Sequence, residues 1–163
     1  MIYNCIDLDC VFRSATPSDF EELRRFVEAG WIELYSPHVP KRSVERFLAE
    51  DGSGRHVCLH LKTFEVGVIN GKIIASINCC DDFITAFFVE GQFRGNGIGS
   101  CLLSNAEIDG GRYLDIPAFN TSALSFYERR GWSRLCEAEE DAFGTRVRSI
   151  TMWKSMNAGG PRT

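Results

Sequence analysis

Apolar residues recur every three or four positions in several stretches of the chain, and this spacing predicts amphipathic helices. The first helix is expected to start after the capping sequence Thr-Pro-Ser-Asp at 16–19 and to end at Gly30. A weaker helix follows Pro40, and the sequence Asp-Gly-Ser-Gly at 51–54 is expected to end it as a flexible turn. Two further helices are predicted over residues 98–109 and 120–129.

Runs of apolar and β-branched residues lie between these helices and predict strands. The expected strands cover residues 10–13, 57–61 or a longer run to Ile69, 72–79, 83–89 and 113–116, with two more around a turn at Phe143-Gly144. Asn70-Gly71 is typical of a hairpin turn. This order of elements predicts a single α/β or α+β domain over residues 1–156, and residues 157–163 are expected to be a disordered tail.

Charge and cysteine content argue against several classes of protein. The formal net charge of −4 disfavours non-specific nucleic-acid binding, which needs a basic face. Seven cysteines without a CxxC pair or zinc-finger spacing disfavour both a disulfide framework and a metal site. The chain shows neither a signal-peptide pattern nor an apolar run of membrane-spanning length. We therefore expect a cytoplasmic protein with neither a membrane nor a nucleic-acid partner.

The segment FFVEGQFRGNGIGS at 87–100 carries the strongest chemical signal in the chain. An apolar strand enters a glycine-rich loop, and the chain leaves the loop as a helix, whose unpaired N–H groups favour phosphate-like anions. A Walker loop would need a lysine that is absent here, and a dinucleotide loop needs GxGxxG, whereas Gly95, Gly97 and Gly99 are spaced two by two. The segment is thus either an anion cradle or a tight turn that packs a helix on a sheet.

Two motifs together resemble those of the GNAT acetyltransferase superfamily. Residues 94–99, RGNGIG, resemble its R/Q-x-x-G-x-G/A signature. Residues 120–132, NTSALSFYERRGW, resemble its second hallmark, an Asn-x-x-Ala-x-x-Phe-Tyr helix that ends in glycine and an aromatic residue. The order of elements from about Val11 to Lys154 also fits. The resemblance implies a mixed, mostly antiparallel central sheet flanked by helices and splayed between its fourth and fifth strands to hold the cofactor.

The resemblance implies that the loop binds the pyrophosphate of acetyl-coenzyme A. The strand before the loop would pair with the pantetheine arm through the backbone of Phe88, Val89 and Glu90, and the amide near Val89 would stabilise an oxyanion. Arg94 would support the loop as well as add charge, or would be a solvent-exposed structural group, and Asn120 would cap its helix and contact the cofactor arm. The cofactor-binding residues implied in this way are Phe88, Val89, Arg94, Gly95, Asn96, Gly97, Ile98, Gly99, Ser100, Asn120 and Tyr127.

The same resemblance gives Tyr127 the role of the acid that protonates the departing thiolate of coenzyme A. A phenol is mostly protonated at neutral pH and can donate its proton when the thiolate forms. Two carboxylates are candidates for the general base: Asp82, for which a polar turn is the alternative interpretation, and Asp115, on the predicted strand 113–116. His38, His56 and His60 are further candidates that are as easily structural.

The acceptor is expected to bind near the segment 31–40, where Glu33 and Tyr35 suit an amine with an apolar portion. The acidic segment 137–145 either attracts a polyamine, an aminoglycoside or a lysine-bearing protein, or is a solvated turn. We expect an N-acetyltransferase that moves an acetyl group from acetyl-CoA directly to a small-molecule amine or to a lysine or N-terminal amine of a protein, as a monomer or homodimer. The alternatives are a non-catalytic acyl-CoA sensor or scaffold and a transferase for longer acyl groups.

Overall fold

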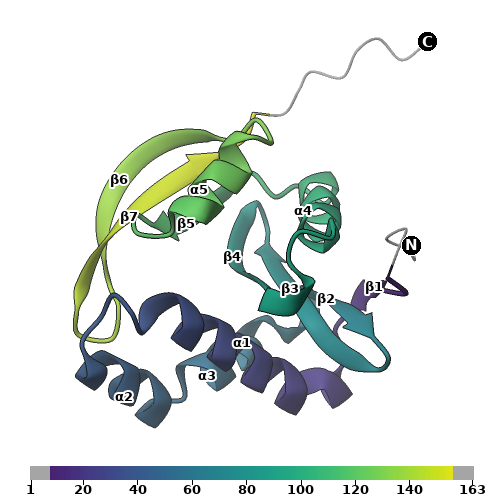
Figure 1. Cartoon of the computed structure of the whole chain (residues 1–163), viewed down its shortest axis with the longest axis horizontal. Coiled ribbons are helices and arrows are strands. Elements are labelled where there is room, and N and C mark those ends of the chain that lie inside the picture. Colours follow the sequence, from purple (N-terminus) through teal and green to yellow (C-terminus); the bar gives the residue numbers. More distant parts are fainter. Residues whose placement is uncertain (1–7, 156–163) are drawn as a thin grey trace.

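A seven-stranded mixed sheet forms the centre of the computed structural model, which describes residues 8–155 (Figure 1). Its strands are β1 (Val11–Ser14), β2 (Phe64–Ile69), β3 (Lys72–Cys80), β4 (Phe83–Val89), β5 (Tyr113–Pro117), β6 (Ser133–Asp141) and β7 (Arg146–Trp153). They are arranged in the order β1-β2-β3-β4-β5-β7-β6. All neighbouring pairs are antiparallel except β4 and β5, which are parallel. The predicted mixed, mostly antiparallel sheet is confirmed.

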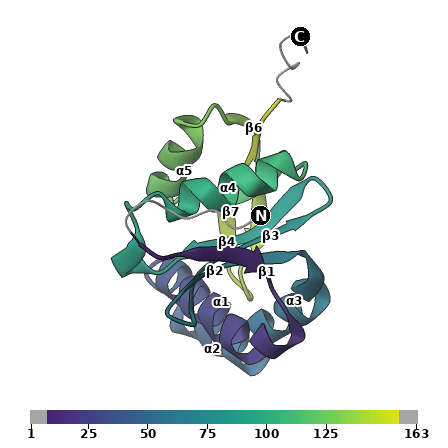
Figure 2. The same ribbon diagram turned by 90° about the vertical axis from the view of Figure 1, so that its right-hand side faces the viewer.

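Helices cover both faces of this sheet. They are α1 (Phe20–Tyr35), α2 (Lys41–Ala49), α3 (Gly52–His60), α4 (Ile98–Ile108) and α5 (Thr121–Glu128), with the 3₁₀ turns η1 (Pro17–Asp19), η2 (Leu61–Thr63) and η3 (Gly91–Phe93). Figure 2 shows α4 and α5 on one side of the sheet and α1, α2 and α3 on the other.

Each face has its own apolar core, because the strands alternate their side chains between the two faces. Leu102 and Leu103 of α4 and Leu124 of α5 pack on the larger core with Ile150 and Met152 of β7. On the opposite face, a second cluster joins α1 and α3 to β2 and β3; its buried members are Leu23, Val27, Val57, Phe64, Val66 and Ile73. Burial at both faces holds the sheet between two helical layers.

The β4 and β5 strands separate soon after they meet. They pair only at Phe83–Tyr113 and Ile84–Leu114, and their carboxyl-terminal halves diverge. A register shift between Asn78 and Cys79 bends the β3–β4 ladder near the same point. The predicted splay between the fourth and fifth strands is confirmed.

Helix α1 does not end at Gly30, as the sequence suggested, but continues to Tyr35. A Cβ atom on Gly30 would lie 2.6 Å from Cδ1 of Phe88, so glycine here permits close contact between α1 and β4. The start of the helix follows the prediction: the Asp19 carboxylate accepts the N–H of Thr16 at 2.7 Å. Two bonds from Arg13, at 2.7 and 2.9 Å, hold the pKa of that carboxyl well below its usual range.

The strand predicted over residues 57–61 is wrong, because these residues belong to α3 and η2. A short apolar run does not distinguish a strand from a buried helix. The expected turn 51–54 instead starts α3: the Asp51 carboxylate accepts the N–H of Gly54 at 3.2 Å and caps the helix. Strand β4 matches its predicted bounds, and the predicted tail 157–163 lies outside the described residues.

Replacing Gly30 by alanine tests the contact between α1 and β4. In an open helix this change would stabilise the protein by about 1 kcal/mol. Because the new methyl group would meet the Phe88 ring, we expect the free energy of unfolding to fall by about 1–2 kcal/mol instead, measured by urea denaturation. Adding Phe88→Leu should recover part of the loss. A Gly30→Ala variant as stable as the parent would contradict this packing.

Candidate functional site

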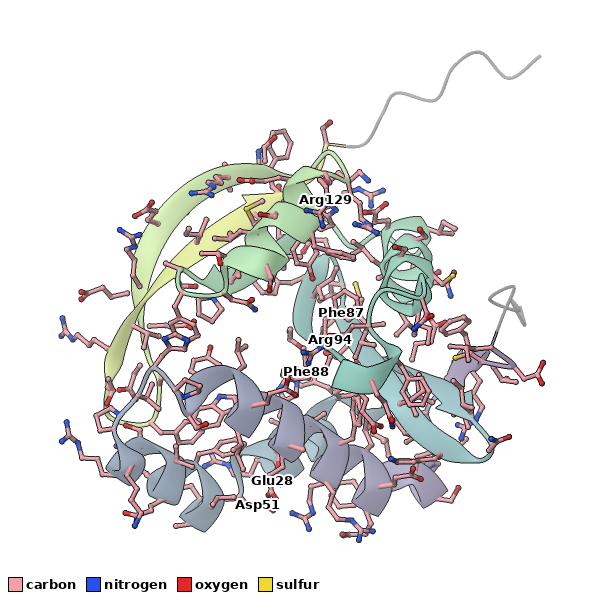
Figure 3. The ribbon with its side chains drawn as sticks, viewed as in Figure 1. Glu28, Asp51, Phe87, Phe88, Arg94 and Arg129 are labelled. Atoms are coloured by element: carbon pink, nitrogen blue, oxygen red, sulfur yellow. The ribbon has the colours of Figure 1, made fainter. Side chains whose placement is uncertain are left out.

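A cavity of about 530 Å³ opens at the point where β4 and β5 diverge, which we call the fork. Figure 3 shows Phe87, Phe88 and Arg94 gathered at this opening above α1, with Arg129 across it near the end of α5. The residues that line the cavity come from α1 and the segment after it, β4, η3 and the glycine loop, and α5 with the segment before it. They are Gly30, Glu33, Leu34, Pro37, His38, Phe87, Phe88, Val89, Phe93, Arg94, Gly95, Gly99, Phe119, Asn120, Thr121, Ser122, Ala123, Phe126, Tyr127 and Arg129.

The backbone of β4 presents unpaired groups to this cavity. The N–H of Glu90 donates to the carbonyl of Ile74 in β3 at 2.9 Å. Because hydrogen-bonded pairs alternate along an antiparallel ladder, the backbone of Phe88 also faces β3, whereas that of Phe87 and Val89 faces the fork. The prediction for Val89 fits this parity. The backbone groups of Phe88 and Glu90 instead point to β3, although Phe88 lines the cavity, and Phe87 turns its backbone groups toward the fork.

The glycine loop turns the chain from β4 into α4 at the mouth of the fork. Gly95 and Gly97 have φ angles of +79° and +81°, which glycine adopts without strain, and Gly97 is the N-cap of α4. The N–H groups of Ile98, Gly99 and Ser100 therefore begin the helix without acceptors four residues earlier. Gly95 and Gly99 line the cavity, whereas the Ile98 side chain is buried in the core. Asn96 lies in the loop and Ser100 in the first turn of α4, and neither residue lines the cavity.

Arg94 braces the loop against two other elements. Its Nε donates to the Val89 carbonyl and its Nη1 to Oε1 of Glu33, both at 2.9 Å. The two side chains are 55% and 57% exposed, so solvent screens the ion pair. Of the two roles considered for Arg94, the structure shows the bracing contact, and the charge remains at the mouth of the cavity.

Two arginines at the end of α5 were not singled out from the sequence. The Arg130 guanidinium donates to Oγ of Ser100 in the first turn of α4 and lies 3.7 Å over the Phe126 ring. The exposed Arg129 lines the cavity. The adjacent arginines in the second motif were the available signal. Their position beside α4 depends on how the two helices pack, which the sequence does not show.

Tyr127 is buried, at 5% exposure, among Phe87, Phe126 and Trp132. Burial raises the pKa of its hydroxyl above the usual value, so the group stays protonated. It lines the cavity, and no hydrogen bond to its hydroxyl occurs among residues 8–155. Asn120, at the start of the same helix, accepts the N–H of Ala123 at 3.3 Å and caps α5 as expected.

The carboxylates considered as general bases lie outside the cavity lining. Asp82 is exposed at the start of β4, the end opposite the glycine loop, where its carbonyl accepts the N–H groups of Arg112 and Tyr113. Asp115 is exposed and accepts the Thr151 hydroxyl at 2.6 Å. The side chain of Asp115 faces away from the core, because Leu114 and Ile116 occupy the other face of β5.

Of the candidate histidines and the predicted acceptor residues, some line the cavity and others do not. His38 and Glu33 line the cavity. His56 is held at 3.2 Å from the Thr85 hydroxyl, and burial beside His60 lowers its pKa. Tyr35 does not line the cavity; its hydroxyl donates to Oε1 of Glu140 at 3.1 Å, and burial, then this carboxylate, raise its pKa.

Within residues 8–155, no three His, Cys, Asp or Glu side chains are grouped closely enough to hold a metal ion. No helix in this part of the chain is both long and apolar enough to cross a bilayer.

Comparison with known proteins bears on this geometry. Residues 47–134 match the acetyltransferase (GNAT) domain model. The PaiA N-acetyltransferase of Thermoplasma acidophilum in complex with coenzyme A is similar at 15% identity and a TM-score of 0.70, over 91% of this chain and 100% of that one. A GCN5-related N-acetyltransferase from Rhodopseudomonas palustris is similar at 18% identity and a TM-score of 0.72, over 96% of this chain and 98% of that one. A chain of the NatC complex bound to Gag peptide and CoA is similar at 17% identity and a TM-score of 0.65, over 91% of this chain and 99% of that one.

Comparison with curated protein sequences gives no match. At identities this low, the likeness to the solved structures shows the fold. The matched domain, by contrast, covers more than half of the chain and includes the fork, the glycine loop and α5. This chain therefore belongs to the GNAT family of acetyltransferase domains.

Proposed function

We propose that this protein is an N-acetyltransferase that moves an acetyl group from acetyl-CoA directly to a primary amine in a ternary complex. One observation carries the proposal: a single cavity joins the glycine loop at the start of α4, the backbone of Val89, whose N–H points away from β3, and the buried Tyr127. These are an anion site, a site for an extended amide chain and a proton donor, in the order in which acetyl-CoA would need them.

The diphosphate of the cofactor would bind at the glycine loop. The first N–H groups of α4 and the positive end of its dipole favour an anion there. Arg129 and Arg130 add positive charge beside the first turn of α4. The similar T. acidophilum structure holds coenzyme A, which supports the choice of this anion.

The pantetheine arm would lie in the fork as an extra strand along β4. Its two amides can pair with the backbone groups of Phe87 and with the N–H of Val89, which β5 leaves free, whereas the Val89 carbonyl is held by Arg94. The thioester carbonyl would then lie near the N–H of Val89, a fixed dipole that stabilises the oxyanion formed on attack.

In the proposed reaction the ammonium form of the acceptor first loses a proton, and the neutral amine then attacks the thioester carbon as a nucleophile. The N–C bond forms and the C–S bond breaks, the amine loses a proton to solvent or a cavity base, and the thiolate takes a proton from Tyr127. Asp82 and Asp115 do not enter this proposal, because neither lines the cavity. Glu33 and His38 are the lining groups that can accept a proton.

Cofactor binding is tested by replacing Gly97 with valine. A β-branched residue at φ +81° would displace the first turn of α4, so we expect the dissociation constant for coenzyme A to rise at least about tenfold in calorimetric titration. Gly71→Val is the matched control, since Gly71 has φ +76° in a hairpin far along the chain from the loop. Equal affinity of Gly97→Val and the parent would contradict the anion site.

The acid is tested by replacing Tyr127 with phenylalanine. We expect kcat to fall about 100-fold while coenzyme A affinity stays within about twofold, because only the proton donor is removed. Since burial raises the pKa of Tyr127, its deprotonation should cause no alkaline loss of rate below about pH 10.

Activity itself is read as acetyl-CoA-dependent release of thiol with a panel of amines. Coenzyme A binding without thiol release on any amine would support the non-catalytic sensor and contradict the enzyme. An unchanged kcat in Tyr127→Phe would remove that residue as the acid and leave the enzyme standing.

A further inference from the structure

We propose that the acceptor is a monocationic primary amine carried on a flat apolar body, such as an arylalkylamine. Its ammonium would pair with Glu33, and its ring would lie against the stacked side chains of His38 and Phe119. This inference rests on the proposed acetyl transfer and names the class of molecule that the acceptor end of the same cavity fits.

The acceptor end is the part of the cavity between the end of α1 and the segment before α5, and Glu33 lies at its border with the glycine loop, where it meets Arg94. It is formed by Glu33, Leu34, Pro37 and His38, at the end of α1 and in the segment after it, and by Phe119 before α5. Most of these side chains are apolar or aromatic. A ligand body at this end therefore gains from contact with apolar surface rather than from many hydrogen bonds.

The His38 and Phe119 rings are stacked face to face, and a planar group can extend this aromatic wall on the side of the exposed His38. Their centroids are 4.0 Å apart and their planes differ by 12°. Tyr35 supports Phe119 edge-on at 5.5 Å and is itself held by its hydrogen bond to Glu140. A wall supported in this way is pre-organised for a planar group, which stacks on it without first ordering side chains.

Tyr35 belongs to a larger aromatic cluster behind this wall. Trp31 stacks on Tyr35 at 4.6 Å and on Phe47 at 4.0 Å, and Phe143 meets both Trp31 and Phe47 edge-on. None of the residues Trp31, Tyr35, Phe47 and Phe143 lines the cavity. Tyr35 contacts the wall directly, whereas Phe143 is joined to Tyr35 through Trp31 and offers a matched aromatic control that is remote from a bound ligand.

The charges favour one positive group on the acceptor. Glu33 is the carboxylate residue among those that line the cavity, and the lining arginines, Arg94 and Arg129, would repel a second cation. The acidic segment 137–145, which suggested a polyamine, contributes no residue to the lining of this cavity, and its side chains have local partners. Glu139 pairs with Arg146 and Glu137 with Arg148, and Asp141 accepts the N–H of Gly144.

Glu33 is paired with Arg94 in the structure, and this ion pair has to open before Glu33 can bind the ammonium of the acceptor. Both side chains are more than half exposed, and such pairs contribute about 0–1 kcal/mol, so a ligand can separate them. A bound diphosphate at the adjacent loop attracts Arg94, which leaves Glu33 for the ammonium. The acceptor is therefore expected to bind after acetyl-CoA.

The test measures thiol release at saturating acetyl-CoA with 2-phenylethylamine, n-hexylamine, spermidine, kanamycin and a lysine-containing peptide. We expect kcat/KM for 2-phenylethylamine to exceed that for n-hexylamine about tenfold, since only the former presents a ring to the wall. Spermidine, kanamycin and the peptide should be poorer acceptors still. A preference for any of these three, or for n-hexylamine, would overturn the inference and leave the transferase proposal intact.

Variants locate the effect on the wall. Phe119→Leu should raise KM for 2-phenylethylamine about tenfold and that for n-hexylamine less than about threefold, with coenzyme A affinity unchanged. Phe119→Tyr retains the ring and should restore the parental KM. Phe143→Leu removes a ring from the same cluster outside the cavity and should leave both KM values unchanged. Equal effects of Phe119→Leu and Phe143→Leu would show a merely structural role and overturn the inference.

The charge is tested separately by Glu33→Gln. We expect KM for 2-phenylethylamine to rise about tenfold, whereas Glu28→Gln, on the same helix but paired with Arg24, should not change it. An unchanged KM in Glu33→Gln would overturn the assigned ammonium site. Absence of thiol release with every amine, with coenzyme A still bound, would instead contradict the proposed function.

Discussion

The divergence of β4 from β5 is the constraint on which the rest of the site depends. A strand that leaves its neighbour exposes backbone N–H and C=O groups, and these need partners from water, side chains or a ligand. Here Arg94 takes the Val89 carbonyl, and the other groups face the cavity. Because β4 and β5 are parallel neighbours, the chain must cross over between them through a helix. The amino terminus of α4 therefore lies at the carboxyl end of β4, which places the helix dipole at the mouth of the fork.

Helix α1 lies against the fork and closes it on one side, so that the fork becomes part of a longer cavity. The absence of a side chain at Gly30 lets α1 approach the Phe88 ring, and the Arg94–Glu33 contact ties the next turn of α1 to the glycine loop. The proposed cofactor end and acceptor end would thus share one space, lined from both faces of the sheet. Any ligand charge at one end acts on the arginine that neutralises the carboxylate at the other.

Aromatic packing, rather than charge, shapes the acceptor end. Acidic residues near the β6–β7 turn suggest an attraction for polycations when the sequence is considered alone. In the fold most of them are engaged by arginines on β7, by a turn amide or by Tyr35. The stacked rings of His38 and Phe119 remain facing the cavity, because Tyr35 and its cluster support them from behind.

What the sequence determined by itself is local. The apolar run 83–89, the glycines that permit positive φ, and the capping residues Asp19 and Asn120 each act over a few residues, and the structure bears out these predictions. Family resemblance added the order of elements and the splay. The tertiary structure alone decided which backbone groups of β4 face the fork, that α1 continues through Gly30, and that residues 57–61 are helical. It also decided that Arg130 meets α4 while Asp82 and Asp115 stay outside the cavity. These features depend on strand register and on contacts between distant segments, and neither is encoded in the spacing of neighbouring residues.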